Sequence, residues 1–347
     1  MPTVKAWATQ SPKSPLAPYQ IPRREPGPKD VEIEIAFCGV CHSDVHQARD
    51  EWGGALFPMV PGHEIVGRVS RVGADVTRLR AGDVAGVGCM VDSCRTCDPC
   101  RHDLEQFCEK GAAFTYNGTE MDRKTPTYGG YSSRIVVDER FTLRIPPGLD
   151  LAGAAPLLCA GITTYSPLRH WKTERGDRVG VVGLGGLGHM AVKLAASMGA
   201  EVTMLSTSRS KETDARRLGA HGFALTSDPA TFKKLAGRFD LIIDTISAPH
   251  DYDAYLGMLR VDGAMVVVGV PPAPVPVHAF SLISGRKTLA GSLIGGIAET
   301  QEMLDHCGKH GITADVEVIP IQKINEAYDR MVKGDVRYRF SIDLKSL

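Results

Sequence analysis

The sequence predicts two domains of different class: a β-rich domain in the first third of the chain, and an α/β domain with a doubly wound parallel sheet in the middle. The length of 347 residues suits two domains of ordinary size. The early strands alternate between apolar and polar residues, whereas the middle of the chain alternates short apolar strands with helical stretches. Strands that alternate with helices indicate a parallel sheet with helices on its faces.

The first third holds three segments that are typical of strands: Val31–Phe37, Ile65–Val72 and Tyr131–Val137. The first reads Val-Glu-Ile-Glu-Ile-Ala-Phe, and Gly, Pro and Asp residues separate the segments. Short strands between many turns favour a partly open barrel or a sandwich.

The pattern changes after about Leu151. A helical stretch ends near Met198, and the tail after about Leu293 does not extend the alternation, so we expect the tail to return to the first domain. The predicted strands of the middle are Arg178–Val182, Val202–Leu205, Leu241–Thr245 and Met265–Val268; the tail has one predicted helix, Ile324–Lys333, and one strand, Tyr338–Leu344.

Composition excludes several classes of function. Forty basic and forty acidic side chains cancel, which leaves no overall field to attract nucleic acid or an anionic membrane. No segment approaches the roughly 20 apolar residues of a spanning helix. The N-terminus lacks the pattern of a secretion signal, and nine cysteines without such a signal indicate thiols rather than disulfides. We therefore expect a cytoplasmic protein.

Four cysteines form the sharpest motif of the chain: Cys94, Cys97, Cys100 and Cys108, spaced Cys-x-x-Cys-x-x-Cys-x7-Cys. Four thiolates in one loop suit a tetrahedral zinc ion. The surrounding segment, Asp92–Lys110, has little hydrophobic periodicity, and metal binding would supply its folding free energy. Two disulfides are the alternative. A closed four-thiolate site has no open position, so this zinc is expected to be structural.

A dinucleotide site is predicted directly after the strand Arg178–Val182. Gly183, Gly185 and Gly188 form Gly-x-Gly-x-x-Gly, and a helix follows from about His189. The glycines allow a tight turn, close approach of a pyrophosphate, and close packing of helix on strand. A tight turn without a ligand is the alternative reading. The predicted loop contains Gly183, Leu184, Gly185, Gly186, Leu187 and Gly188.

The choice of cofactor is read about 20 residues further on, where NAD enzymes usually carry an acid. Here the segment has no acid before Glu212. Small hydroxyls and positive charges suit a 2′-phosphate, which a carboxylate would repel. NADP(H) is therefore favoured over NAD(H), through Ser206, Thr207, Ser208, Arg209 and Lys211.

A second metal site is predicted from residues far apart in the sequence. Cys41, His63 and Cys159 provide a Cys2His set, which is known from the catalytic zinc of alcohol dehydrogenases and leaves one position open. Glu64 is either a transient fourth ligand or a nearby charge, and Asp44 can orient His63 through its second ring nitrogen. The open position would polarise a carbonyl oxygen or stabilise an alkoxide.

Two residues near Cys41 are candidates for proton transfer. Ser43 could contact the substrate oxygen, and His46 could finish the relay through a ribose hydroxyl of the cofactor. Taken singly, Ser43, His46 and Cys159 could also be a turn hydroxyl, a surface imidazole and a buried thiol. Cys38, Cys89, Cys307, His170 and His189 are expected to be ordinary residues without a role.

The sequence resembles the zinc-dependent medium-chain dehydrogenases, and within them the cinnamyl alcohol dehydrogenase branch with its bacterial NADP-dependent aldehyde reductases. The resemblance spans essentially the whole chain. The matching motifs are Gly39–Asp44, Pro61–Gly67, the four-cysteine segment, Leu158–Tyr165, Gly183–His189, Gly291–Gly296 and Arg337–Phe340.

This resemblance implies a GroES-like catalytic domain with an inserted Rossmann domain, and a homodimer. The implied boundaries are 1–157 and 293–347 for the catalytic domain and 158–292 for the NADP-binding domain. It implies two zinc ions per chain and reversible hydride transfer between NADP(H) and an aldehyde or primary alcohol. It also implies cofactor contacts by Thr163 and, more weakly, by Ser292 and Arg339.

The substrate class is less specific. Trp52, Leu56 and Met90 are expected either to line an apolar pocket for aromatic or medium aliphatic aldehydes or to be ordinary packing. Three other functions stay open: an NAD-linked polyol or secondary-alcohol dehydrogenase, a cofactor-binding protein without activity, and a nucleic-acid-binding zinc ribbon. The mixed charges of Asp92–Lys110 oppose the last of these.

Overall fold

The computed structural model describes residues 3–347 and divides into two compact units. The first is made from both ends of the chain, up to Cys159 and from Gly295 to Leu347, and the second is Ala160–Ile294. Within the described residues no single helix is long and apolar enough to cross a membrane, although the bent pair Leu151–Leu158 and Ala160–His170 meets the length and composition criteria together.

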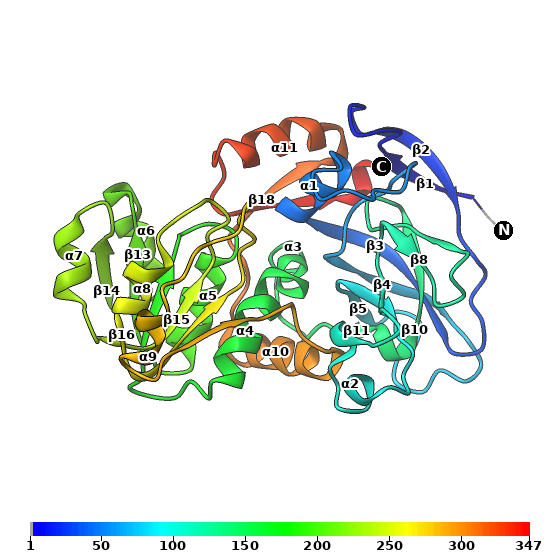
Figure 1. Cartoon of the computed structure of the whole chain (residues 1–347). Helices are drawn as coiled ribbons and strands as arrows, with labels where there is room; N and C mark the ends of the chain where they lie inside the picture. Colours follow the sequence, from blue (N-terminus) through cyan, green and yellow to red (C-terminus); the bar gives the residue numbers. More distant parts are fainter. Residues whose placement is uncertain (1–2) are drawn as a thin grey trace. The chain divides into compact units, whose positions relative to one another are not determined.

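The first unit is built around a mixed sheet of seven strands (Figure 1). Its order is β11-β5-β4-β3-β19-β18, with β10 also paired to β3. The helices and strands before Cys159 are β1 (Thr3–Ala8), β2 (Ala17–Pro22), β3 (Asp30–Val40), α1 (His42–Ala48), β4 (Ile65–Val72), β5 (Val84–Val87), β6 (Met90–Asp92), α2 (Asp98–Arg101), β7 (Ala113–Phe114), β8 (Gly118–Thr119), β9 (Pro126–Thr127), β10 (Arg134–Asp138), β11 (Leu143–Arg144) and α3 (Leu151–Ala154).

The central strand β3 explains why this sheet forms. Val31 and Ile33 are fully buried, and Glu32 between them is also buried because Ser70 and Arg71 of the paired strand β4 bond its carboxylate. β3 pairs antiparallel with β4, β10 and β19, so three strands depend on its register. The prediction of a β-rich first domain is confirmed.

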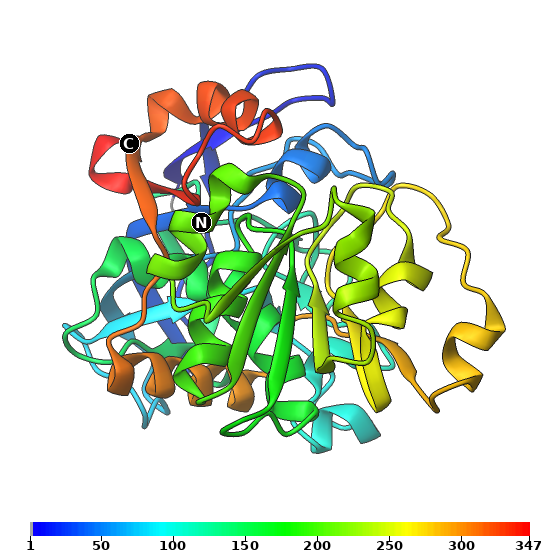
Figure 2. The same cartoon turned by 90° about the vertical axis from the view of Figure 1, so that its left-hand side faces the viewer.

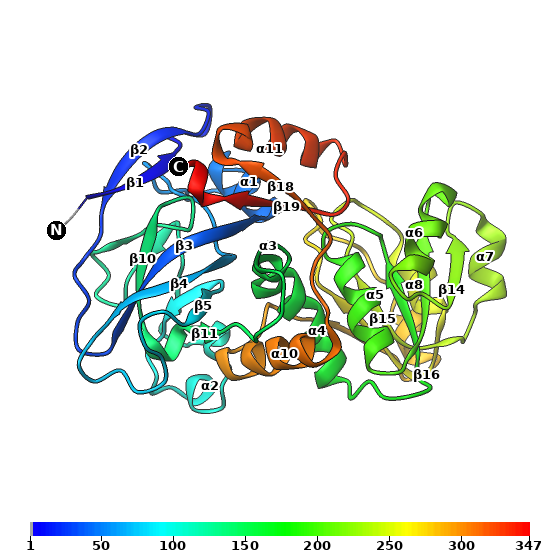
Figure 3. The same cartoon turned by 180° about the vertical axis from the view of Figure 1, so that it is seen from behind.

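The C-terminal tail joins the same sheet. Its elements are α10 (Ile297–His310), β18 (Val316–Pro320), α11 (Ile324–Val332) and β19 (Arg339–Asp343). Figure 3 shows β18 and β19 (orange to red) beside β3 (blue), although some 300 positions separate Val40 from its pairing partner Phe340. The tail, from Gly295 to Leu347, therefore lies in the same compact unit as β3.

The second unit carries a parallel sheet of six strands in the order β14-β13-β12-β15-β16-β17. Figure 2 turns this sheet (green to yellow) toward the viewer, with helices packed against it. Its elements are α4 (Ala160–His170), β12 (Arg178–Val182), α5 (Gly188–Ser197), β13 (Glu201–Ser206), α6 (Glu212–Arg217), β14 (Gly222–Leu225), α7 (Pro229–Lys234), β15 (Phe239–Asp244), α8 (Tyr252–Gly257), β16 (Leu259–Val267), α9 (Ala279–Ile283) and β17 (Thr288–Gly291).

The strand order of this sheet fixes where a ligand binds. The chain builds β12, β13 and β14 outward in one direction, then crosses back to place β15 on the other side of β12. This is the order of dinucleotide-binding domains, and ligands bind where it reverses, at the carboxyl ends of the two central strands. Those strands end at Val182 and Asp244.

Two element predictions were wrong in detail. The strand predicted at Tyr131–Val137 forms only at Arg134–Asp138, because Tyr131 bonds Trp7 and Pro61 through its backbone instead. The tail was expected to hold one helix, yet α10 precedes α11. The buried face of α10 has helical spacing but includes polar or small residues, which hid it: Thr300, Met303, Leu304 and Cys307.

Candidate functional site

The four-cysteine segment brings its sulfur atoms together, with the ligand atoms of Cys94, Cys97, Cys100 and Cys108 all within 4.8 Å of one another. All nine cysteines are free, which excludes the disulfide alternative for this segment. Backbone amides of Thr96 and Cys97 lower the pKa of Cys94 to about 5, whereas burial raises the pKa of Cys100 to about 12. Crowded, buried thiols ionise together only beside a cation, so this donor set fits zinc.

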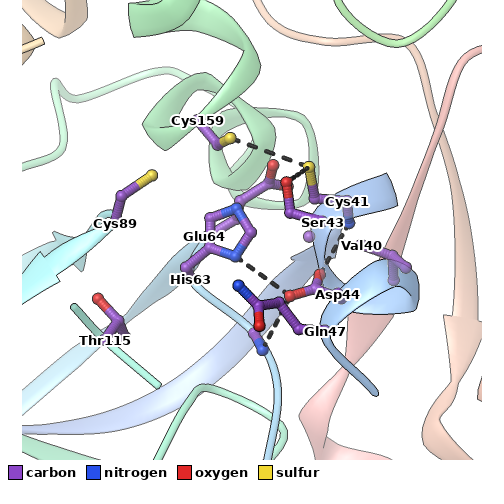
Figure 4. A network of polar contacts seen from close by, with 12 residues as sticks. Val40, Cys41, Ser43, Asp44, Gln47, His63, Glu64, Cys89, Thr115 and Cys159 are labelled. Carbon is purple, nitrogen blue, oxygen red and sulfur yellow. Dashed lines mark hydrogen bonds and ion pairs between the residues drawn. The ribbon is translucent and has the colours of Figure 1, made fainter. Parts of the chain in front are cut away.

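A second group of possible ligands lies at one edge of the large sheet. One ligand atom from each of Cys41, His63, Glu64 and Cys159 lies within 4.8 Å of the others. The pairing of β3 with β4 explains how Cys41 meets His63 and Glu64, because Cys38 lies opposite Ile65 and the residues just beyond that pair therefore share an edge. Figure 4 shows the side chains converging. Two thiols, an imidazole and a carboxylate at this separation fit a zinc ion.

Asp44 holds two of these residues in place. It is fully buried, and its carboxylate accepts hydrogen bonds from the Cys41 amide (2.8 Å) and the Gly62 amide (3.2 Å). His63 Nδ1 lies 3.1 Å from Asp44 Oδ1 (Figure 4). A carboxylate only accepts, so Nδ1 carries the proton and Nε2 keeps its lone pair for a metal. The hydroxyl of Tyr131 adds a further bond at 3.3 Å.

Glu64 is buried beside a cation from the other end of the chain. One carboxylate oxygen pairs with the guanidinium of Arg339, whose Nε donates to Val40 O at 3.1 Å. The other oxygen, Oε2, is buried without a hydrogen-bond partner among residues 3–347. Burial raises the pKa of Glu64 to about 7, although Arg339 opposes the shift. An unsatisfied carboxylate oxygen within the ligand group is a second indication that a cation belongs there.

Ser43 and His46 lie three residues apart on α1 and therefore share one face of the helix. Ser43 Oγ is 3.6 Å from Cys41 Sγ. His46 Nδ1 is 2.5 Å from Glu51 Oε2, and its ring stacks on Trp52 at 5.0 Å between centroids. The structure thus places a hydroxyl beside the ligand group and an imidazole one turn away.

Two residues at this edge were missed by the sequence analysis. The Cys89 side chain, expected to have no role, points toward His63 and Cys159 in Figure 4, and its Sγ is 3.8 Å from Leu158 O. The Tyr116 ring stacks on His63 at 5.7 Å. No local motif marks either residue. The register of β4 and β5, where Ile65 lies opposite Val87, brings Cys89 to this edge.

The glycine loop of the second unit has the predicted form. Gly183 follows β12 with φ +88, and a Cβ at Gly188 would overlap the Gly183 carbonyl oxygen. A Cβ at Gly185 would meet no atom within 4 Å among the described residues, so the backbone there is open to a ligand. The loop ends at α5, whose N-terminus faces the loop, as in sites that bind phosphate.

The segment after β13 lies against that loop. Lys211 Nζ donates to Leu184 O at 2.9 Å, which fixes the lysine beside the glycines. Ser208 Oγ contacts Ser210 Oγ at 2.9 Å, and Arg209 and Thr207 are exposed. Ser206 is buried and accepts the Ser208 amide at 3.3 Å, so it shapes the turn.

The remaining predicted residues are spread over both units. Thr163 is buried in α4, and the Ser292 amide donates to Val267 O at 3.2 Å just after β17. Trp52 and Leu56 are half exposed, at 48% and 51%, and so are available to a substrate. Met90 is 2% exposed and packs in the core, which favours ordinary packing for this residue.

Comparison with known proteins gives a consistent answer. Residues 27–147 match the family model described as alcohol dehydrogenase GroES-like domain, and residues 186–309 match zinc-binding dehydrogenase. The chain is 56% identical to NADP-dependent alcohol dehydrogenase C 1 of Mycolicibacterium smegmatis, covering 100% of this chain and 99% of that protein. It is 53% identical to an aldehyde reductase of Escherichia coli, covering 99% of each.

A solved structure agrees. The cinnamyl alcohol dehydrogenase of Helicobacter pylori, complexed with NADP(H), superposes with a TM-score of 0.92 at 42% identity, and the match covers 99% of this chain and 98% of that one.

Proposed function

The chain belongs to the family of zinc-binding alcohol dehydrogenases, and from that premise we propose that it is an NADP(H)-linked alcohol dehydrogenase that works mainly as an aldehyde reductase. The observation that carries the proposal is the convergence of Cys41, His63, Glu64 and Cys159 within 4.8 Å. Three of them, Cys41, His63 and Cys159, are the proposed ligands of a catalytic zinc, with Glu64 beside them. The four-cysteine segment is proposed to hold a second, structural zinc.

The test of this assignment removes one ligand at a time. Cys41→Ala and His63→Ala should each abolish NADPH-dependent aldehyde reduction while the protein stays folded and binds NADPH. Zinc content should fall from two per chain to one, because the four-cysteine segment stays intact. Aldehyde reduction that persists in either folded variant would overturn the proposal.

The chain's own residues account for the proton that accompanies hydride transfer. When bound, zinc supplies a Lewis acid for a carbonyl oxygen, and NADPH supplies the hydride. Ser43 Oγ, 3.6 Å from Cys41 Sγ, stands where it can give or take the proton of the substrate oxygen. His46 directs Nδ1 to Glu51, so its Nε2 is left to pass the proton toward solvent.

The preference for NADP(H) is supported by the segment after β13. Arg209 and Lys211 supply positive charge there, and Glu212, the first acid, is bonded by Arg216 at 3.0 Å and lies 3.6 Å from Arg209. The named activity of the M. smegmatis relative and the bound cofactor of the H. pylori enzyme support the same choice. Parallel kinetics with NADPH and NADH test it, and a preference for NADH would instead favour an NAD-linked polyol or secondary-alcohol dehydrogenase.

The other cofactor contacts are proposals that rest on position. Thr163 is assigned to the nicotinamide, and Ser292 follows β17 at the carboxyl edge of the parallel sheet. Arg339 pairs with Glu64 in the first unit. Its guanidinium would therefore have to contact the cofactor while it keeps this ion pair. The domains proposed for these roles are 1–157 with 293–347 for catalysis, and 158–292 for NADP(H).

The substrate is proposed to be an aromatic or medium aliphatic aldehyde. Trp52 and Leu56 offer exposed apolar surface, and Leu56 is held by a bond from its amide to Asn117 Oδ1 at 2.7 Å. The rates of NADPH-dependent reduction of benzaldehyde, cinnamaldehyde, butanal and glyceraldehyde compare aromatic, aliphatic and polar substrates. A preference for glyceraldehyde would contradict an apolar site.

A homodimer is proposed from the exposed edge of the parallel sheet. β17 ends the sheet, and α9 beside it exposes Phe280 (65%) and Ile283 (67%). Large apolar side chains at an open strand edge favour pairing with a second copy. Light scattering after gel filtration should give twice the mass of one chain. The Phe280→Glu variant should give the mass of a single chain.

A reducing compartment, the cytoplasm, is proposed because all nine cysteines are free. Cell fractionation tests this directly, and recovery of the protein outside the cytoplasm would contradict it.

A further inference from the structure

The segment between β15 and α8 packs directly against the glycine loop. Its first residue, Thr245, donates from Oγ1 to Val182 O at 2.7 Å. A Cβ at Gly183 would lie 3.0 Å from Ile246 Cγ1. β12 and β15 are the two strands at which the strand order reverses, so this segment forms one wall of the dinucleotide crevice. Whatever holds residues 245–250 in shape therefore shapes the crevice.

Asp244 and His250 close this segment at its two ends. Asp244 is fully buried; its Oδ1 accepts the Ile246 amide at 3.1 Å, and its Oδ2 lies 3.0 Å from His250 Nε2. The backbone oxygen of Asp244 accepts the amides of Val268 (2.9 Å) and Gly269 (3.2 Å) from the loop after β16. Asp244 thus joins the two loops that follow the neighbouring strands β15 and β16.

The ring of His250 faces two acceptors. Nε2 points to the Asp244 carboxylate, and Nδ1 lies 2.8 Å from the Ala248 carbonyl oxygen. Neither a carbonyl oxygen nor a carboxylate donates, and a neutral imidazole carries only one N–H. Both bonds form together only when both ring nitrogens are protonated. The geometry therefore describes an imidazolium.

The surroundings of the ring agree with this state. Partial burial lowers the pKa of His250, but the bonds to Asp244 and Ala248 and the charges of Asp244 and Asp251 outweigh it, so the pKa is raised. The rings of Tyr252 and Tyr255 pack against it at 4.8 and 5.6 Å.

We propose that His250 is a positioning residue for the cofactor: its imidazolium ties the 245–250 wall to Asp244 and holds the crevice in the shape that binds NADP(H). This inference rests on the proposed function. A raised pKa in the folded state means that the tie is complete at pH values below the ordinary histidine range and is lost as the pH rises through the folded value. NADPH affinity should fall in the same window.

The dissociation constant of NADPH, measured by calorimetry from about pH 6 to about pH 9, tests the proposal. Each unit by which bound NADPH raises the pKa of His250 corresponds to a factor of 10 in affinity, and we expect a loss of roughly three- to tenfold that depends on His250. His250→Gln can donate from only one nitrogen and cannot titrate, so this variant should bind NADPH more weakly at low pH and lose that part of the pH dependence. His278→Gln, which changes an exposed imidazole of the same unit, should follow the wild type.

Two further measurements keep the test decisive. Asp244→Asn removes the charge but keeps the shape, so it should flatten the profile even if His250→Gln fails to fold. In NMR spectra the His250 ring should titrate above the ordinary value of about 6.5 and move higher with NADPH. Equal slopes for the wild type and both variants would overturn this inference alone. A wild type that binds no NADPH at any pH would overturn the proposed function and this inference with it.

Discussion

Replacing Asp44 with asparagine should release the proposed catalytic zinc while leaving all of its proposed ligands in the sequence. The Asp44 carboxylate accepts bonds from the Cys41 amide, the Gly62 amide, His63 and Tyr131 in a fully buried position. Asparagine has nearly the same size, but half of its polar group donates, so at least one of these donors would face another donor. His63 would then lose the acceptor that fixes its tautomer.

The magnitude follows from what is lost. A hydrogen bond to a charged group contributes about 1.5–3 kcal/mol, and loss of the partner of a metal ligand typically costs about 10- to 100-fold in metal affinity. Asp44 holds both Cys41 and His63, so we expect the upper end of that range, a loss of roughly 100-fold in zinc affinity. NADPH-dependent reduction should fall with the zinc content of the protein.

Competition with a coloured chelator measures zinc affinity, and atomic emission counts the ions that remain. Glu51→Gln is the matched control, because Glu51 contacts His46 and is not among the bonds to the ligand group. The control should keep two zinc ions per chain, whereas Asp44→Asn should keep only the one in the four-cysteine segment. Wild-type zinc affinity in folded Asp44→Asn would refute the reasoning, because it would show that the ligands are oriented without this carboxylate.

Three further changes test other parts of the structure. Gly39→Ala should destabilise the fold by about 1–3 kcal/mol in thermal unfolding, because the new Cβ would overlap the Glu64 carboxylate and lie 3.0 Å from Glu64 Cβ; an unchanged melting temperature would contradict this packing. Arg209→Ala should raise KM for NADPH about tenfold with little effect on KM for NADH, since only NADPH has a 2′-phosphate; equal effects on both would exclude a 2′-phosphate contact. Arg71 lowers the pKa of Glu32 to about 2, so Glu32 stabilises the fold above its unfolded pKa, and that stability is lost as the pH falls through the folded pKa. Glu32→Gln should therefore lower the free energy of unfolding by on the order of 2 kcal/mol at neutral pH and by almost nothing near pH 2. A cost that does not depend on pH would rule out the ion pair as its cause.

Local pattern alone was enough for much of the fold. The strands Ile65–Val72 and Arg178–Val182 match their predicted bounds, and α11 begins at the predicted Ile324. These segments carry a strong apolar periodicity, which a short window of sequence contains. The glycine loop is equally local, because the turn, the phosphate approach and the helix start all lie between Gly183 and Gly188.

The residues of the site that the sequence pattern could not predict depend on contacts between residues far apart in the chain. Cys89 looked like an ordinary thiol, and only the register of β5 on β4 brings it toward His63. Tyr116 reaches the same histidine from a segment with little regular structure. The sequence analysis did not single out His250. The two acceptors of its ring, the Ala248 carbonyl oxygen and the Asp244 carboxylate, come together only in the folded loop.

The metal edge of the first unit is completed by the last strand of the chain. β19 pairs with β3 so that Phe340 lies opposite Val40, which places the neighbouring Arg339 against Val40 O and Glu64. Without that guanidinium the Glu64 carboxylate would lose the largest of its favourable charge interactions, and burial would raise the pKa of Glu64 further. The charged form of the acid beside the ligand group therefore depends on the pairing of the C-terminal strand β19 with β3.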